Sequence, residues 1–496
     1  MAGFFKKNIV KRLLLNPSAF RLTYIFTLFF CSVAVVEWAA VTFKYVLMAW
    51  AGYIFFFYYL KNRRILNIRY CRWLVIFLMS TLLTALIHVT DNFLGNLVMF
   101  LHIAICFFIF YGMHTERNKK RVRKEMYWFC KLMVIITTAL AAVGLPFVLL
   151  NMYGDFYGYH LIVYENRFTG LYTNPNLLGF SSAVAIICCH MLTRKKFLKH
   201  AGGKKTRLWL LLPCAALNLV SLFLSDSNAS LVFLIFYVVF YLVYRVFRWQ
   251  QEITLKEAAK KFAKLFAVCL VAAVSLVFAR ELCQMTAGGI TTVTTKQEPV
   301  INKDTPGGKK PEGPVSFNHL NDNIDSGRIR LLMESAVLIG NHPLFGIGKE
   351  NLVLYGERYI EGGLHFSDLH NGYLTIIVCG GIVGFVIFVA FALHVARHII
   401  KSLFLEKKNL SKTAFPILFA FICAYCVYAV FEKTLLFEQT FMVVSFWLML
   451  GYASCFMVRY DHLEDKIELN LLRKREGEQA SLYDTPTEDD PLDELG

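Results

Sequence analysis

Two arginines and one histidine, far apart in the chain, have side chains suited to chemistry on a phosphorylated substrate. Arg167 stands in ENRFTGLYTNPNLLGF, Arg328 in SGRIRLLMESAVLIG and His370 in FSDLHNGYLTIIVCGGIVGF. A guanidinium is permanently charged and its planar fork matches phosphate oxygens, while histidine has the one ordinary side-chain pKa near neutrality. A single arginine beside an apolar run is more often an interfacial anchor than a ligand. The three residues together favour transfer of a group from a phosphate leaving group.

Four nearby polar residues are secondary candidates. Arg330, Asn371 and Asn176 are predicted to bind substrate, although Arg330 can equally pair with Glu334 four residues further along a helix. Asp368 is a possible orienter that holds the neighbouring imidazole in one tautomer. A carboxylate in a loop is more often simply solvated than involved in function.

The sequence predicts no metal site and no cofactor. Asp322 and Asp325 lack an evident third ligand, and the 13 cysteines form no CxxC pair or Cys/His cluster at zinc spacing. The GIG of Gly346 to Gly348 follows no predicted strand and lacks the lysine of a phosphate-binding loop, so it reads as a turn.

The composition indicates an integral membrane protein. Of 496 residues, 57% are hydrophobic and 18% charged, which excludes a disordered chain and disfavours an ordinary soluble enzyme. A net charge of +17 would point to nucleic acid in a soluble domain. Here the lysines and arginines lie in short clusters between apolar runs, as membrane topology requires. Membrane lipids, and no nucleic acid, are therefore the predicted surroundings.

Apolar windows long enough to cross the hydrocarbon, about 20 residues each, predict an all-α polytopic membrane protein of about twelve spans. The first is too long for the apolar part of a cleaved signal peptide and lacks an Ala-x-Ala site. The windows are 22–43, 45–60, 73–90, 96–113, 127–150, 173–192, 208–224, 229–247, 265–282, 371–394, 413–430 and 438–458.

The loop charges predict the orientation and the domains. Basic clusters follow every even-numbered span up to the tenth, so both termini are predicted to be cytoplasmic. Residues 1–282 would hold nine spans, 283–370 one large external loop, 371–458 three spans and 459–496 an acidic cytoplasmic tail. The Thr-, Gly- and Pro-rich first part of the loop is predicted to be mobile. Residues 326–340 are predicted to form an amphipathic helix, with Ile329, Leu332, Ala336 and Ile339 at helical spacing.

Three segments resemble a known family: RFTGLYTNPNLLG, SGRIRLLMESAVLIGNHPLFGIGKENL and HNGYLTIIVCGGIVG. They look like the O-antigen ligase and O-antigen polymerase superfamily of bacterial envelope polysaccharide synthesis. Their order, the external loop before the last three spans and the number of spans all match, over roughly residues 70–450. The most specific piece is the His-Asn-x-x-Leu string followed seven residues on by Gly381.

The resemblance implies a GT-C-like, metal-independent inverting glycosyltransferase of the bacterial cytoplasmic (inner) membrane. Its donor would be a glycan on undecaprenyl diphosphate in the outer leaflet, and its acceptor another glycan or a lipid. Arg167 and Arg328 would hold the diphosphate, and His370 would orient or deprotonate the acceptor hydroxyl. A ligase and a polymerase share this donor, and weak compositional grounds lean towards a polymerase for capsule or exopolysaccharide.

One position departs from the family pattern, and two other functions compete. Family members often carry a Ser-Arg pair near position 227, whereas this chain reads LSDSNASLV with Asn228 where Arg is expected. A contact is then missing or is supplied by Arg330. The main rival is a lipid-linked oligosaccharide flippase or other transporter, which typically shows internal repeats and midplane charges that this chain lacks. A multi-span sensor would carry a cytoplasmic signalling domain, and the short acidic tail supplies none.

Overall fold

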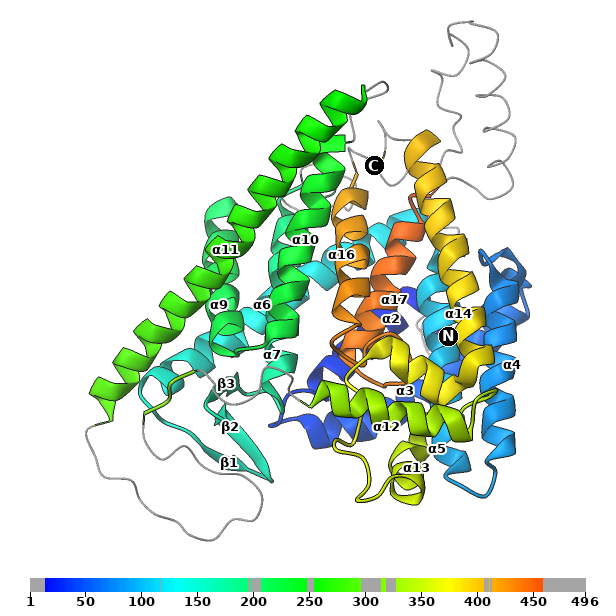
Figure 1. Ribbon diagram of the computed structural model, residues 1–496. Helices are drawn as coiled ribbons and strands as arrows, with labels where there is room; N and C mark the ends of the chain where they lie inside the picture. Colours follow the sequence, from blue (N-terminus) through cyan, green and yellow to red (C-terminus); the bar gives the residue numbers. More distant parts are fainter. Residues whose placement is uncertain are drawn as a thin grey trace, which may run out of the picture.

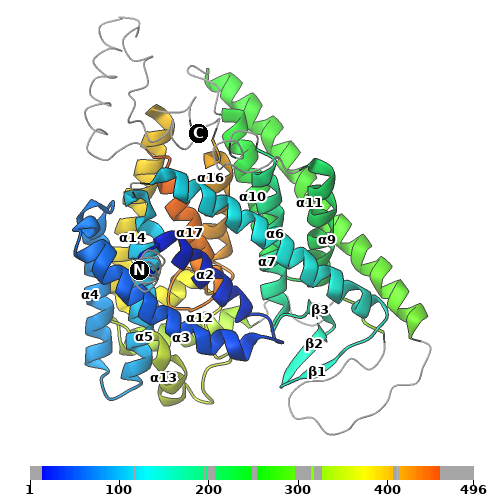
Figure 2. The same cartoon turned by 180° about the vertical axis from the view of Figure 1, so that it is seen from behind.

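The computed structural model describes residues 14–116, 118–194, 197, 207–247, 254–295, 314–317, 327–405, 410 and 413–457. They form a helical bundle with a small sheet at one end (Figures 1 and 2). Seven helices are long and apolar enough to cross a membrane, and four shorter apolar helices accompany them. The fold is therefore that of an all-α polytopic membrane protein, as predicted, while the number of twelve spans stays a prediction.

The bundle's helices follow the predicted windows most closely in the middle of the chain. α9 (Leu208–Leu224) and α10 (Asn228–Phe247) begin and end within one residue of them. The others are α4 (Cys71–Ile87), α5 (Phe93–Ala104), which continues through η3 (Ile105–Phe110) and η4 (Tyr111–Thr115), α6 (Lys119–Leu149), α7 (Pro175–Leu192), α16 (Phe415–Tyr428) and α17 (Phe441–Ser454).

The first predicted span, 22–43, is wrong as one helix. The chain forms α2 (Pro17–Phe30), a break, and α3 (Glu37–Ile54), which continues as η1 (Phe55–Leu60) before η2 (Arg64–Asn67). The break needs no proline or glycine because its backbone is paired elsewhere: the Ala34 amide donates to the Leu171 carbonyl at 2.9 Å, and the Thr173 amide to the Ser32 carbonyl at 3.0 Å. These bonds supply what a helix would otherwise provide.

The predicted end of the ninth span also differs. α11 runs from Leu255 to Thr294, so the residues from Thr286 onwards, predicted to be mobile, begin as helix. Thr291 donates to the Val315 carbonyl at 3.0 Å and ties this end to the only nearby loop residues described, 314–317. The rest of the expected mobile part and the tail 459–496 lie outside the described residues.

A sheet and two short helices occupy one end of the bundle in both views (Figures 1 and 2). The antiparallel strands are β1 (Gly154–Phe156), β2 (Tyr159–Tyr164) and β3 (Arg167–Gly170), in that order. α12 (Arg328–Asn341) is the predicted amphipathic helix, and it is followed by η5 (Lys349–Asn351) and α13 (Leu352–Tyr359). The sheet, α12 and α13 thus gather at the same end of the bundle (Figures 1 and 2).

The helix that follows, α14 (Gly372–Leu405), is broken at Gly381, whose φ of 69° and ψ of −180° are not helical. Residues 343–348 cross the break. The amides of Ile347 and Gly348 donate to the Val378 and Cys379 carbonyls at 3.1 and 3.0 Å. On the other side, Ile382 and Val383 donate to the carbonyls of Pro343 and Leu344 at 2.8 and 3.1 Å. The HPLFGIG turn therefore replaces the hydrogen bonds that the break removes.

We predict that Gly381→Ala destabilises the protein by about 3 kcal/mol, because its φ and ψ are nearly exclusive to glycine and a Cβ would clash with the Leu344 carbonyl oxygen. Thermal unfolding in detergent measures the change. Gly52→Ala in α3 is the matched control, since a Cβ there meets nothing within 4 Å. Equal melting temperatures for both variants would contradict the prediction.

Candidate functional site

His370 lies at the start of α14 in a tightly fixed turn. Its backbone has φ of 43°, in the left-handed region, and its amide donates to Asp368 Oδ1 at 3.1 Å. Asn371 Oδ1 accepts from the amides of Tyr373 and Leu374, both at 3.0 Å, so Asn371 caps the helix. The Asn371 side chain, predicted to bind substrate, thus has a structural task in this turn.

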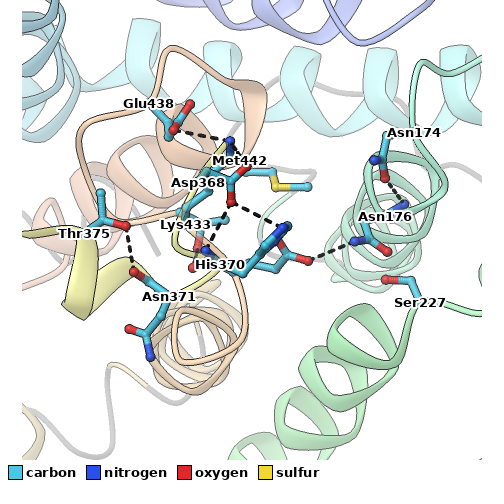
Figure 3. Close-up of polar contacts among 12 residues, drawn as sticks. Asn174, Asn176, Ser227, Asp368, His370, Asn371, Thr375, Lys433, Glu438 and Met442 are labelled. Carbon is cyan, nitrogen blue, oxygen red and sulfur yellow. Dashed lines mark hydrogen bonds and ion pairs between the residues drawn. The ribbon is translucent and has the colours of Figure 1, made fainter. Parts of the chain in front are cut away.

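The loop after α16 supplies a carboxylate that joins two arms of the site. Glu432 Oε2 lies 3.8 Å from His370 Nδ1, and Glu432 Oε1 accepts from Asn176 Nδ2 at 3.1 Å. Asn176, at the start of α7, in turn accepts from Arg167 Nη2 at 2.7 Å. Figure 3 shows His370 and Asp368 on one side and Asn176 on the other. Arg167 and His370, distant in sequence, are therefore connected through Asn176 and Glu432.

Arg167 is largely buried and holds a neighbouring turn. Its Nε donates to the Ser225 carbonyl at 2.9 Å, and its Nη2 also approaches the Asp226 carbonyl at 3.4 Å. Among the described residues, Nη1 has no hydrogen-bond partner. Arg167 thus positions the turn between α9 and α10.

A row of alternating charges continues from Asp368 through Lys433 and Glu438 to Lys349. Lys433 Nζ lies 2.5 Å from Asp368 Oδ2 and 3.4 Å from Glu438 Oε1. Glu438 Oε1 also lies 2.7 Å from Lys349 Nζ. Asp368 Oδ1 is 3.4 Å from His370 Nε2, so Asp368 contacts the imidazole while its other oxygen pairs with lysine. This position is compatible with the predicted role of orienter.

Arg328 and Arg330 have different surroundings, although they are one residue apart. The Arg328 guanidinium lies over the Phe431 ring, 5.4 Å from its centroid, and the side chain is exposed. Phe431 directly precedes Glu432, so Arg328 stands beside the site. Arg330 instead pairs with Glu334, with Nε 2.8 Å from Oε1. The structure thus brings Arg328, and not the Arg330 guanidinium, to the residues around His370.

At Asn228, where the family pattern has Arg, a guanidinium arrives from another helix. Arg280 of α11 donates from Nη1 to Asn228 Oδ1 at 2.6 Å, and the same atom is 3.5 Å from Asp226 Oδ1. A positive charge is therefore present on this turn, from Arg280 and not from Arg330.

The charges around His370 favour its protonated form. The Glu432 carboxylate is the largest cause of a raised pKa of His370; burial opposes it and Asp368 adds to it. Burial raises the pKa of Asp368, but Lys433 and His370 outweigh it and leave that pKa below its ordinary value. Asp368 is thus a stable anion, and His370 is the group whose charge can change.

Residues 213–389 match the family model described as O-antigen ligase. This segment is similar to the O-antigen ligase family. This match confirms the resemblance predicted from the sequence and supports a role as a polysaccharide ligase or polymerase of glycosyltransferase type. The matched segment contains Arg328 and His370, whereas Arg167 and Glu432 lie outside it. No curated protein matches the chain.

Several charged residues around His370 were not predicted from the sequence. Glu432 and Lys433 stand in the FEKT turn between two apolar helices, where the loops of that face are otherwise nearly free of lysine and arginine. That contrast was the available signal. No comparable sequence signal marked Lys349 and Glu438, because their ion pair joins distant segments of the chain. Within the described part of the chain, no group of three His, Cys, Asp or Glu side chains could hold a metal ion.

We predict that Glu432→Gln lowers the pKa of His370, because the variant removes the largest cause of its raised value. Diethyl pyrocarbonate modifies neutral imidazole, so the pH profile of His370 modification, followed by mass spectrometry, reports this pKa. The inflection should move to lower pH in Glu432→Gln. The control Glu357→Gln, at an exposed carboxylate of α13, should leave it in place; an unmoved inflection in Glu432→Gln would contradict the predicted coupling.

Proposed function

We propose that the protein transfers a glycan from an undecaprenyl-diphosphate carrier to an acceptor hydroxyl at the outer face of the bacterial inner membrane, by a metal-independent inverting reaction. The acceptor is another glycan or a lipid, which corresponds to a polymerase or a ligase. The observation that carries the proposal is the contact series Arg167, Asn176, Glu432 and His370, beside exposed Arg328. This arrangement places arginine side chains that can bind a diphosphate close to a histidine that can act as a base.

Arg328 and Arg167 have distinct proposed roles. Exposed Arg328 contacts the diphosphate directly and offsets the charge that develops on it as it leaves. Buried Arg167 uses Nε and Nη2 to fix the turn and Asn176, and offers Nη1 to the donor. Arginines can supply in this way the electrostatic stabilisation that a metal ion gives in other enzymes.

The proposed reaction is a single displacement. The acceptor oxygen forms a bond to the anomeric carbon while the bond from that carbon to the diphosphate oxygen breaks, and the electron pair leaves with undecaprenyl diphosphate. His370 takes the proton of the acceptor hydroxyl, which requires a neutral imidazole. Glu432 and Asp368 stabilise the imidazolium that results.

The first test is turnover of an undecaprenyl-diphosphate-linked glycan from the source cell by the purified protein in detergent. We expect His370→Ala to lower the rate by roughly 10²- to 10⁴-fold, and Arg328→Ala by roughly 10²-fold or more. Arg330→Ala is the matched control and should keep most of the activity, because Arg330 pairs with Glu334.

The products separate the candidate functions. Lengthening glycan chains indicate a polymerase, and transfer only to an added acceptor indicates a ligase. Full activity in both His370→Ala and Arg328→Ala would place the chemistry elsewhere. Lipid flipping without transfer would favour the rival transporter.

The proposed base role also predicts a pH dependence. The rate should rise as pH passes the raised pKa of His370, because the protonated imidazole cannot accept a proton. Glu432→Gln lowers that pKa, so the acid limb of the pH–rate profile should move to lower pH. Initial rates across pH for wild type, Glu432→Gln and the control Glu357→Gln measure it. A limb that moves to higher pH, or does not move, would argue against His370 as the base.

A further inference from the structure

Helix α12 exposes large apolar side chains on one of its faces. Ile329, Leu332, Met333 and Val337 are 58%, 59%, 65% and 41% exposed. The buried face includes Glu334 and Ser335, whose side chains have partners: Glu334 pairs with Arg330 and accepts from the His365 amide, and Ser335 donates to the Leu331 carbonyl. Leu331 and Leu338 are also buried, and Ile339 of the predicted stripe packs against the core, whereas Ile329 and Leu332 of that stripe face outwards together with Met333 and Val337.

This exposed stripe is continuous with the surface of a helix that is apolar enough to cross a membrane. After α12, Leu344 is 60% exposed, and its carbonyl accepts from Val383 in α14 at 3.1 Å. The neighbouring Ile382 and Val386 of α14 are also exposed. Figure 1 shows α12 running across the end of the bundle, nearly at right angles to the long part of α14. The stripe thus begins where the surface of a candidate span ends.

We propose that α12 is an interfacial helix whose apolar face, formed by Ile329, Leu332, Met333 and Val337, is buried among the acyl chains of the adjacent membrane leaflet. Large apolar side chains are stabilised by removal from water, and a bilayer removes them without any further protein partner. A helix lying in the interface has this combination of an apolar face and flanking arginines.

The charges at the start of α12 fit the same surroundings. Arg328 and Arg330 flank Ile329 and are exposed, so their guanidinium groups would reach the level of the lipid phosphates when the apolar stripe lies just below. The bilayer then sets the depth of Arg328. If the proposed function holds, this is the depth at which the diphosphate of a membrane-anchored donor arrives.

Hydroxyl-radical footprinting of the full chain in phosphatidylcholine nanodiscs tests the proposal, because methionine is oxidised where water reaches it. Met79, 60% exposed in the middle of the apolar helix α4 and of predicted span 73–90, is the lipid-facing reference. The water-facing reference is the variant Tyr157→Met, at a site 89% exposed in the turn between β1 and β2. We expect Met333 to be oxidised at a rate close to that of Met79, and at least about fivefold more slowly than the methionine in Tyr157→Met.

A phospholipid carrying a diazirine on its acyl chain then identifies what covers the stripe. Adducts on the residues of the exposed face, and none on the buried Leu331 and Leu338, are the expected result. Oxidation of Met333 as fast as in Tyr157→Met would overturn the proposal, because the face would be in water. Protection of Met333 without lipid adducts would also overturn it, because protein and not lipid would then cover the helix. Both readouts are independent of glycosyl transfer, so they stand even if the proposed activity fails.

Discussion

The hydrogen bonds between the break in α14 and residues 343–348 are the constraint on which the site depends. A helix interrupted within an apolar bundle leaves amides and carbonyls that cost several kcal/mol each unless they find partners. Here the partners are supplied on both sides of Gly381. The first part of α14 can therefore turn away from the long part. The Gly372 amide donates to the Ala429 carbonyl at 2.7 Å, which holds His370 and Asn371 against the end of α16 and near Glu432.

The site itself is organised by charge balance. Lys433 and Lys349 pair with Asp368 and Glu438, while Asn176 links Glu432 to Arg167. Partly buried charges are tolerated when they are paired, and removing one leaves its partner uncompensated. His370 is the member of the site whose pKa is raised by its carboxylate neighbours, which favours its protonated form. Uptake of a proton there adds a positive charge beside the carboxylates of Asp368 and Glu432.

The sequence predicted local features well and long-range pairings poorly. Apolar windows located α9 and α10 almost to the residue, because each helix is bounded by its own polar neighbours. The break between α2 and α3 was missed because CSVAVV contains neither proline nor glycine and is stabilised by a segment far along the chain. Chemical type and resemblance singled out Arg167, Arg328 and His370. The linking role of Glu432, and the Arg280 that reaches Asn228, depend on contacts between distant helices that no local pattern encodes.

The pairing of the α2–α3 break with residues 171–173 has a consequence for biosynthesis. The amide of Ala34 and the carbonyl of Ser32 find their partners only in a strand-like segment that is translated after α4, α5 and α6. The first two helices therefore leave the ribosome with a connection whose polar backbone is not yet satisfied. Such a connection is stable in water or within the insertion machinery, and not in lipid. The N-terminal helix pair should accordingly reach its final depth late, when the sheet has closed over it.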